Sequence, residues 1–217
     1  MMKLFKIFSA ATLVATLLIV SCKKEQTTIG KNQNSLSSQA SAKSILYTMP
    51  DEMQPQEGTW LQWPHQYTYG YNYKVRLEPA WVAMTKELVQ VEKVHIIAYN
   101  NTEKNRIVTQ LQNAGVSLTN VDFKIHQTND CWVRDNGPIF VRNSSNQLRI
   151  EDWGFNGWGK KAPYKKDDII PNSVGTDIGM AVINLNSSLV VEGGAMDIDG
   201  NGTFMATKTS ILNTITN

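Results

Sequence analysis

The sequence is poor in histidine, cysteine and net charge. Its 217 residues include three histidines and two cysteines, and 21 basic residues are nearly balanced by 19 acidic ones, for a formal net charge of +2. The small excess of positive charge is scattered, so it offers no basic stripe and we predict no nucleic-acid partner. His65, His95 and His126 lie far apart, with no paired metal-ligand spacing around them. We therefore predict no metal site.

Two catalytic patterns are also missing. The sequence has no glycine loop of the kind that cradles phosphates and no Gly-x-Ser-x-Gly element. The histidines offer little in their place. His95 alternates within an apolar stretch and is expected to be structural, and His65 is expected to lie in a surface loop, with a pocket as the alternative.

Long hydrophobic runs are absent except at the start of the chain. Lys3 and Lys6 precede an apolar and small-residue run from Ile7 to Val20, which is shorter than the roughly 20 residues that span a bilayer. This layout is typical of an export signal, with a single-pass anchor as the weaker alternative. Residues 19–22, Ile-Val-Ser-Cys, resemble the bacterial lipoprotein box. We predict a lipoprotein signal peptide over 1–22, lipidation of Cys22 and a membrane-anchored position in the bacterial cell envelope; an ordinary secretory signal cut near Ser21 is the alternative.

Residues 23–44 contain no aromatic residue and few apolar ones. Such a segment cannot bury enough surface to offset the entropy of ordering it, so we predict a disordered tether. If Cys22 is acylated, only Cys131 remains, and no intramolecular disulfide can form. The folded part, predicted to begin near residue 45, must be held together by its core.

From residue 45 onward, strand and helix patterns alternate at short intervals. Strands are predicted at 58–63, 93–99 and 121–126, as a pair around a polar turn within 138–155, and as a pair around 199–202, whose Asp-Gly-Asn-Gly is a hairpin signal. Helices are predicted at 77–93, 101–115 and, more weakly, 169–181; Pro79 is compatible only with a first turn. This order indicates an α/β fold of repeated small units, although no sequence repeat is visible.

The segment "NDCWVRDNGPIF" (129–140) places charge beside an aromatic ring. Asp130 and Asp135 bracket Trp132 and Arg134. Two acids beside a ring can receive a planar cation, because a carboxylate accepts paired N–H bonds and the ring face attracts the charge. The alternative is an internal ion pair between Arg134 and one aspartate, with Trp132 in the core. Spacing alone leaves both open.

Three further features surround this segment. Glu192 ends a predicted apolar strand and precedes Gly193 and Gly194, so its backbone could approach another group closely. The segment "WGFNGWG" (153–159) is either a substrate-facing aromatic loop or a tight turn between strands. Cys131 is a poor candidate nucleophile, since neighbouring carboxylates disfavour the thiolate.

Taken in order, four stretches resemble the agmatine deiminase and Porphyromonas-type peptidylarginine deiminase family. They are "MPDEMQPQEGTWLQWPH" (49–65), "DCWVRDNGPIFV" (130–141), "WGFNGWG" (153–159) and "VVEGGAMDIDGNGTFMATKTSILN" (190–213). The resemblance implies the pentein fold, an α/β propeller of five ββαβ modules. It also implies hydrolysis of a C–N bond in a linear amidine: a cysteine attacks the guanidinium carbon, a histidine moves protons, and no cofactor is needed.

Position by position, the resemblance assigns roles to five residues. Asp135 would clamp the guanidinium nitrogens and Trp132 would be the aromatic wall beside the substrate. Glu192 would hold the catalytic centre, so Asp135 and Glu192 are the candidate catalytic residues. Asp130 and Arg134 would support this geometry.

The sequence departs from the family in one major way. The Gly-His-x-Asp element and the late nucleophilic cysteine have no counterpart among these residues. We therefore expect 45–217 to be the N-terminal part of a deiminase domain, with roughly half of the pentein modules, and we expect this chain to be inactive alone. The expected reaction of the full-length protein converts agmatine to N-carbamoylputrescine and ammonia, as in putrescine biosynthesis. A peptidylarginine deiminase making citrulline and a non-catalytic guanidinium-binding lipoprotein are the alternatives.

Overall fold

The computed structural model describes residues 46–212 of the chain. These residues belong to one compact unit that spans 43–217. The predicted signal peptide, Cys22 and the tether lie outside the described residues. Among the residues that are described, no helix is both long and apolar enough to cross a membrane.

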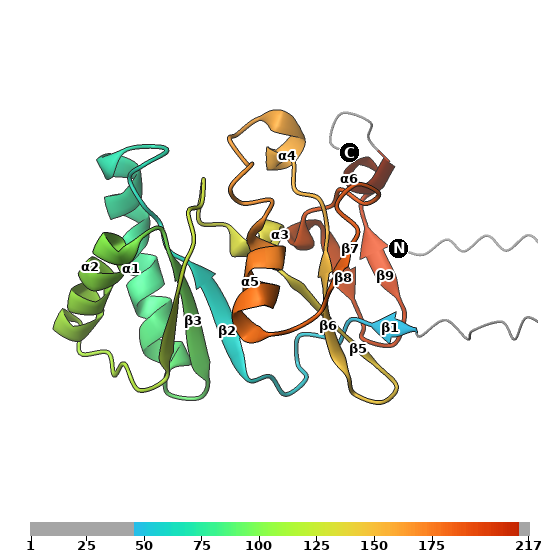
Figure 1. Cartoon of the computed structure of the whole chain (residues 1–217), viewed down its shortest axis with the longest axis horizontal. Helices are drawn as coiled ribbons and strands as arrows, with labels where there is room; N and C mark the ends of the chain where they lie inside the picture. The colour runs from blue at the N-terminus through green and yellow to red at the C-terminus, as the bar shows by residue number, and fades with distance from the viewer. Residues whose placement is uncertain (1–45, 213–217) are drawn as a thin grey trace, which may run out of the picture. The chain divides into compact units, whose positions relative to one another are not determined.

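Three parallel strands form the first sheet, in the order β2 (Gly58–Gln62), β3 (Lys93–Ala98) and β4 (Val121–Ile125). Helices α1 (Tyr71–Leu88) and α2 (Asn101–Asn113) connect them and pack against one face (Figure 1). The central strand β3 is buried at every position after Lys93, as expected for a parallel strand that is covered on both faces. The predictions for these strands and for the helix at 101–115 are confirmed.

Helix α2 has a local signal at each end. The side chain of Asn100 accepts a hydrogen bond from the backbone N–H of Glu103 at 2.8 Å, which satisfies one of the free donors of the first turn. Gly115, with φ of +72°, follows the last turn in a conformation that favours glycine. Together they fix where the helix starts and stops.

Helix α1 begins earlier than the sequence predicted. It starts at Tyr71, so Pro79 lies in the interior of the helix and not in its first turn, and that prediction is wrong. Proline has no N–H to donate to the carbonyl four residues earlier, which here belongs to Val75. Both Pro79 and Val75 are exposed to solvent. Water can satisfy this carbonyl, which explains why the helix continues. The buried side of α1 is formed by Lys74, Glu78, Trp81 and Thr85.

The second sheet is mixed, in the order β1 (Tyr47–Thr48), β5 (Ile139–Asn143), β6 (Leu148–Asp152) and β7 (Val182–Asn184). Strands β5 and β6 are antiparallel, and β6 pairs in parallel with β7 after helix α5 (Ile170–Ile178). The succession β5-β6-α5-β7 is a ββαβ unit. The hairpin of β8 (Met196–Ile198) and β9 (Phe204–Ala206), followed by α6 (Lys208–Leu212), starts with the same β-β-α order.

Helix α5 lies between the two larger sheets and joins their cores. Ile170 and Val174 of α5 are fully buried together with Ile97 of β3 and Ile150 of β6. In Figure 1, α5 stands between β2 and β6. This shared cluster holds the two sheets together through β3, β6 and α5.

The apolar strand predicted to end at Glu192 does not form. Over this stretch Val190 alone makes a bridge, to Gly154. The preceding residues are folded into a turn in which Ser188 and Leu189 both donate to the carbonyl of Leu185. The turn leaves too few extended residues for a strand, and Glu192 instead precedes the short 3₁₀ helix η1 (Gly193–Ala195).

Candidate active site

The site is built on the segment that follows β4. Residues 129–132 lead into the one-turn helix α3 (Val133–Asn136), in which the Trp132 carbonyl accepts from Asp135 N–H at 2.9 Å. A Cβ on Gly137 would lie 2.3 Å from the carbonyl oxygen of Val133, so only glycine fits there. The segment lies at the carboxyl edge of a parallel sheet, where α/β folds commonly place ligands.

Asp135 is where three separate segments meet. Its Oδ2 accepts a hydrogen bond from the indole Nε1 of Trp158 at 3.1 Å, and its Oδ1 accepts one from the backbone N–H of Gly194 at 3.2 Å. Trp158 belongs to 153–159 and Gly194 to the Glu-Gly-Gly element. The structure therefore brings together the three motifs that the sequence singled out, and the two donors fix the orientation of one carboxylate.

The Glu-Gly-Gly element fits against α3 because its glycines have no side chains. A Cβ on Gly193 would lie 2.3 Å from the carbonyl oxygen of Arg134, and one on Gly194 would lie 2.3 Å from Oδ1 of Asp135. Real Cβ atoms do not approach so closely, so a side chain at Gly193 would force η1 away from α3, and one at Gly194 would displace the Asp135 carboxylate. The close backbone approach predicted from the two glycines is confirmed.

The 153–159 loop reaches Asp135 through unusual backbone geometry. Trp158 has φ of 56° and Gly159 has φ of 79°, and a left-handed conformation costs a non-glycine residue roughly 1–2 kcal/mol. The side chain of Asn156 accepts from Gly159 N–H at 2.7 Å, and the Phe155 ring packs edge-on against Trp158. The loop is thus both a tight turn and the source of a side chain in the site.

Trp132, three residues before Asp135, is half-exposed. It has 41% of its surface accessible, and its ring meets the buried Trp81 ring edge-on with centroids 5.9 Å apart. One side of the indole is therefore supported by the core while part of the ring remains open to a ligand. Trp132 is therefore not a core residue, which was the alternative considered from the sequence.

Asp130 and Arg134 are placed differently from each other. Asp130 is buried and its Oδ1 accepts from the Tyr73 hydroxyl at 2.6 Å and from Cys131 N–H at 2.8 Å. Arg134 is exposed, and its Nη1 pairs with Glu52 at 2.5 Å. Arg134 makes no ion pair with either aspartate among the described residues, so the internal pair weighed from the sequence is not seen there.

Glu192 stands at the start of η1, next to the glycines that contact α3. Its side chain is partly buried and makes no hydrogen bond within residues 46–212, whereas its backbone carbonyl accepts from Ala195 N–H at 2.9 Å. The structure thus has Glu192 next to the glycines that contact the segment of Asp135, and not at the end of a strand.

Cys131 is not available for reaction. Its side chain is 2% exposed, and burial, followed by the charge of Asp130, raises the pKa of the thiol far above its ordinary value. A nucleophile requires the thiolate. Cys131 is a packed core residue.

Two buried aspartates lie outside the motifs that the sequence singled out. Asp167 and Asp152 are both fully buried. Burial, which is the larger cause, and a neighbouring carboxylate raise the pKa of Asp152 to about 6, and burial raises that of Asp167 to about 7. Asp167 accepts hydrogen bonds from the segment that carries Asp130. In the sequence, Asp167 stands in the charged stretch "KKDDII" just before a predicted apolar helix. Nothing in that stretch indicates a buried residue.

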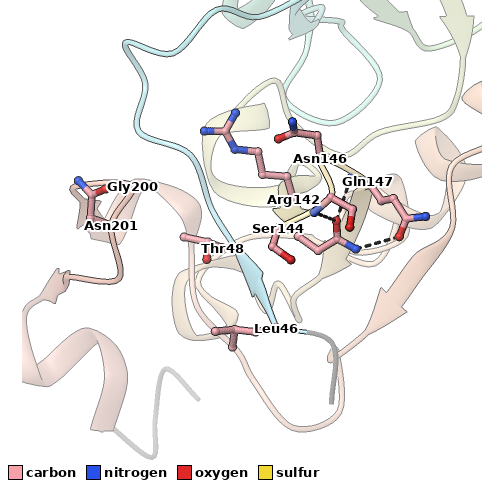
Figure 2. A pocket seen from close by; sticks show the side chains of 10 residues that line it. Leu46, Thr48, Arg142, Ser144, Asn146, Gln147, Gly200 and Asn201 are labelled. Carbon is pink, nitrogen blue, oxygen red and sulfur yellow. Dashed lines mark hydrogen bonds between the residues drawn. The ribbon is translucent and has the colours of Figure 1, made fainter. Parts of the chain in front are cut away.

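A polar hollow of about 780 Å³ lies at the other end of β5. Figure 2 shows Thr48 and Leu46 between the β5–β6 turn and Gly200–Asn201. Because β5 begins just after α3 and ends at Asn143 in this hollow, its five residues separate the hollow from the site by roughly 15 Å. The hollow is therefore not part of the Asp135 site.

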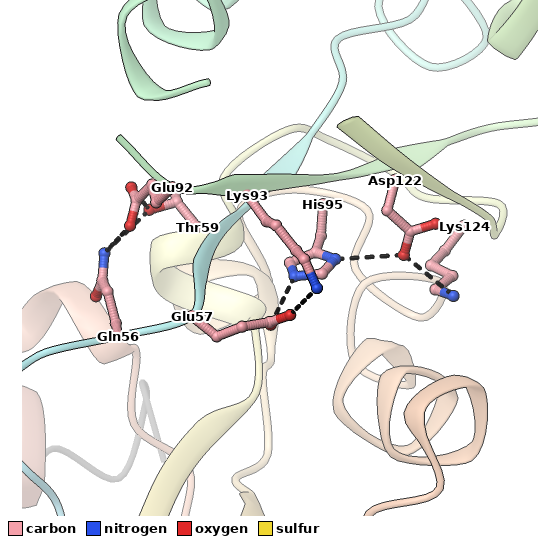
Figure 3. A network of polar contacts seen from close by, with 8 residues as sticks. All are labelled: Gln56, Glu57, Thr59, Glu92, Lys93, His95, Asp122 and Lys124. Atoms are coloured by element: carbon pink, nitrogen blue, oxygen red, sulfur yellow. Dashed lines mark hydrogen bonds and ion pairs between the residues drawn. The ribbon is translucent and has the colours of Figure 1, made fainter. Parts of the chain in front are cut away.

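The histidines serve the scaffold. His95 of β3 is buried, stacks on Trp60, and lies between Glu57 and Asp122 at 3.2 and 3.3 Å (Figure 3), in agreement with a structural role. His65 is buried and not in a surface loop, so that prediction is wrong. Its Nδ1 accepts from Tyr67 N–H, so Nε2 carries the proton and donates to the Thr128 carbonyl at 3.0 Å. Burial lowers the pKa of this ring.

Metal coordination has no support in residues 46–212, which contain no group of three or more His, Cys, Asp or Glu side chains arranged to hold an ion.

The arrangement of sheets and helices matches that of solved deiminases. A substrate-bound agmatine deiminase of C. jejuni superposes with a TM-score of 0.70 at 23% identity, over 85% of this chain and 51% of that one. An agmatine deiminase of Enterococcus faecalis superposes with a TM-score of 0.69 at 26% identity, over 79% and 46%. The fold is thus the pentein α/β fold, and that prediction is confirmed.

The family follows from the sequence match over the same region. The model of the Porphyromonas-type peptidyl-arginine deiminase family matches residues 48–217, and the chain belongs to this family. The agmatine deiminase of Pseudomonas aeruginosa strain LESB58 is 30% identical over 174 residues, which cover 77% of this chain and 45% of that protein. The chain thus spans about half the length of the curated relatives it matches.

Proposed function

We propose that this chain is the substrate-clamping part of a hydrolase that deiminates a guanidinium compound, with agmatine as substrate and N-carbamoylputrescine and ammonia as products. One observation carries the proposal: the Asp135 carboxylate is oriented by donors from two other motifs and lies in the same turn as the half-exposed Trp132. Names of the relatives at 30% identity support agmatine over other guanidines.

The geometry explains how such a cation would be held. An ionised carboxylate has about four acceptor positions, and the indole of Trp158 and the N–H of Gly194 occupy two of them. The remaining positions can accept two guanidinium N–H groups as a bidentate pair. The Trp132 face adds attraction for the cation and its alkyl chain. Glu192, beside these groups, is proposed to orient the reacting centre.

Clamping alone does not break the C–N bond. Deimination requires a nucleophile at the guanidinium carbon and a group that protonates the departing ammonia. Cys131 is buried and the other cysteine, Cys22, falls in the predicted signal peptide. We therefore propose that 45–217 is the N-terminal part of a deiminase domain and that this chain alone does not turn over agmatine.

The coding DNA that follows Asn217 provides the first test. An open frame with a Gly-His-x-Asp element and a late cysteine supports the proposal, and the protein it encodes should release ammonia and the ureido product from agmatine. A protein with those elements that leaves agmatine intact would refute it. Ammonia release by the 217-residue chain at an enzymatic rate would refute the proposed division of roles.

A peptidylarginine deiminase is the second candidate. Its support is the description of the matching family together with the export signal predicted for residues 1–22, because an extracellular address suits a protein substrate. The same assay separates the two: formation of citrulline in an arginine-containing peptide, with agmatine unchanged, would favour this candidate.

A guanidinium-binding lipoprotein without turnover is the third. Its support is that the described residues hold the Asp135 clamp while their one cysteine, Cys131, is buried. A genuine stop codon after Asn217, combined with micromolar binding of agmatine by the chain, would favour it.

We also propose that Cys22 carries lipid and holds the protein at a membrane of the bacterial cell envelope. Each buried CH₂ of an acyl chain contributes about 0.8 kcal/mol to membrane binding. Cells fed labelled palmitate should incorporate label into the protein, and Cys22→Ala should lose it while Cys131→Ala keeps it. Equal labelling of Cys22→Ala would contradict the proposal.

A further inference from the structure

Asp167 is a buried carboxylate that belongs to none of the motifs. It lies just before α5, and the solvent does not reach it. Taking a carboxylate out of water is unfavourable unless donors surround it. The identity of those donors shows what the side chain does.

Most of the donors come from the segment that leads to Trp132. Oδ1 of Asp167 accepts from Asn129 N–H at 2.7 Å, and Oδ2 accepts from Asp130 N–H at 3.1 Å. Two consecutive backbone groups that no strand or helix satisfies are therefore paired with one carboxyl group. Left unpaired, the N–H of the buried Asp130 in particular would be costly.

The end of β2 completes the arrangement. Nε2 of Gln62 donates to Oδ1 of Asp167 at 3.0 Å and also to the carbonyl of Asp130. In the reverse direction, the side chain of Asn129 accepts from Lys166 N–H at 2.8 Å. The segment is thus held from β2 on one side and from 166–167 on the other.

The hold continues along the chain toward the site. Asp130, once its backbone is fixed, accepts from Tyr73 and from Cys131 N–H through its side chain. Trp132 follows Cys131 directly, and Asp135 lies in the turn of α3 that begins there. A shift of the Asp130 backbone would therefore also displace the half-exposed indole of Trp132.

We propose that Asp167 is a positioning residue: it holds the Asn129–Trp132 segment in the conformation that presents Trp132 to the substrate. That Trp132 meets the substrate rests on the proposed function, whereas the claim that Asp167 holds the Asn129–Trp132 segment does not. The electrostatics agree with the geometry. Burial raises the pKa of Asp167 to about 7 and the charge of Asp130 adds to this, while the N–H groups of Asn129 and Asp130 oppose it. These N–H groups replace the water molecules that would otherwise solvate the Asp167 carboxyl group.

The test compares amide hydrogen exchange in the full chain and in two variants at Asp167. Asp167→Ala removes every acceptor, and Asp167→Asn keeps one carbonyl oxygen. We expect exchange at Asn129 and Asp130 to accelerate about tenfold or more in Asp167→Ala, as follows from the loss of one hydrogen bond at each amide, and less in Asp167→Asn. The matched control is Asp152→Asn, which changes another buried carboxyl group that does not contact the segment.

The outcomes separate a local role from a general loss of stability. Faster exchange confined to residues 129–132 in the Asp167 variants supports the proposal. Equal acceleration in Asp152→Asn, or unchanged exchange at Asn129 and Asp130 in folded Asp167→Asn, overturns it. If Asp167→Ala does not fold, Asp167→Asn decides alone.

Agmatine titration, followed by tryptophan fluorescence, tests the link to the substrate. We expect Asp167→Asn to weaken binding about five- to tenfold, as for the loss of one hydrogen bond, with Asp152→Asn unchanged. If the wild-type chain does not bind agmatine, the proposed function fails while the exchange result still decides the role of Asp167. Loss of segment order with full agmatine affinity would show that Asp167 does not position the substrate.

Discussion

Replacing Asp135 by alanine should weaken agmatine binding by the chain about 100-fold or more. The carboxylate is the charged acceptor oriented by Trp158 and Gly194, and a hydrogen bond to a charged group contributes about 1.5–3 kcal/mol. Loss of a bidentate pair therefore removes about 3 kcal/mol or more, which corresponds to a factor of about 100 in Kd. Isothermal calorimetry at neutral pH and low salt measures it.

Two variants control for loss of charge and for loss of fold. Asp197→Ala removes an exposed aspartate of β8 and should leave the affinity within about twofold, because surface charges contribute little. Asp135→Asn keeps one acceptor oxygen, so its affinity for agmatine should lie between those of Asp135→Ala and Asp197→Ala. Agmatine affinity of Asp135→Ala within twofold of wild type would place the clamp elsewhere.

Replacing Gly193 by alanine should destabilise the folded chain by about 3 kcal/mol. The new Cβ would lie 2.3 Å from the backbone carbonyl oxygen of Arg134, and a backbone atom in the turn of α3 cannot rotate away as a side chain can. Overpacking of a close-packed contact costs about 1–3 kcal/mol, and occasionally more. Urea denaturation followed by circular dichroism measures the free energy of unfolding.

The neighbouring glycine should respond differently. A Cβ on Gly194 would meet Oδ1 of Asp135, and this side chain can turn away. Gly194→Ala should thus cost less stability than Gly193→Ala but should impair agmatine binding.

Gly115→Ala is the matched control for both glycine variants. Its Cβ would meet nothing within 4 Å, although its φ of +72° adds backbone strain of roughly 1–2 kcal/mol. A Gly193→Ala variant no less stable than Gly115→Ala would mean that η1 and α3 are not tightly packed.

Much of the scaffold was predictable because its signals are local. The strand patterns at 58–63, 93–99 and 121–126 and the helix pattern at 101–115 lie within short windows, and the structure has each of these elements. Helix α1 was misplaced because its buried face carries Lys74, Glu78 and Thr85, so hydrophobic spacing pointed to the wrong residues. Glu78, for example, is buried because it accepts from the Trp63 indole at 3.0 Å and pairs with Arg106.

The sequence singled out candidate residues for the site but not the contacts between them. Trp132, Asp135 and Glu192 stood out because charged and aromatic residues interrupt turns and apolar stretches. The hydrogen bond from Trp158 to Asp135 depends on left-handed backbone at Trp158, a conformation that its sequence does not announce. Asp167 was missed for a related reason: its partners, Gln62 and the Asn129–Asp130 backbone, are distant in the sequence.

The two donors to Asp135 have a consequence for the order in which the protein is made. Both follow it in the sequence, Trp158 by 23 residues and Gly194 by 59. Contacts between residues distant in the sequence form more slowly than local ones, because closing a longer loop costs more entropy. During synthesis the β2–β3–β4 sheet can form before the second donor has left the ribosome. The pair of hydrogen bonds that orients Asp135 would then be among the last features of this chain to assemble, and a nascent chain that ends before Gly194 would hold Asp135 without its full set of partners.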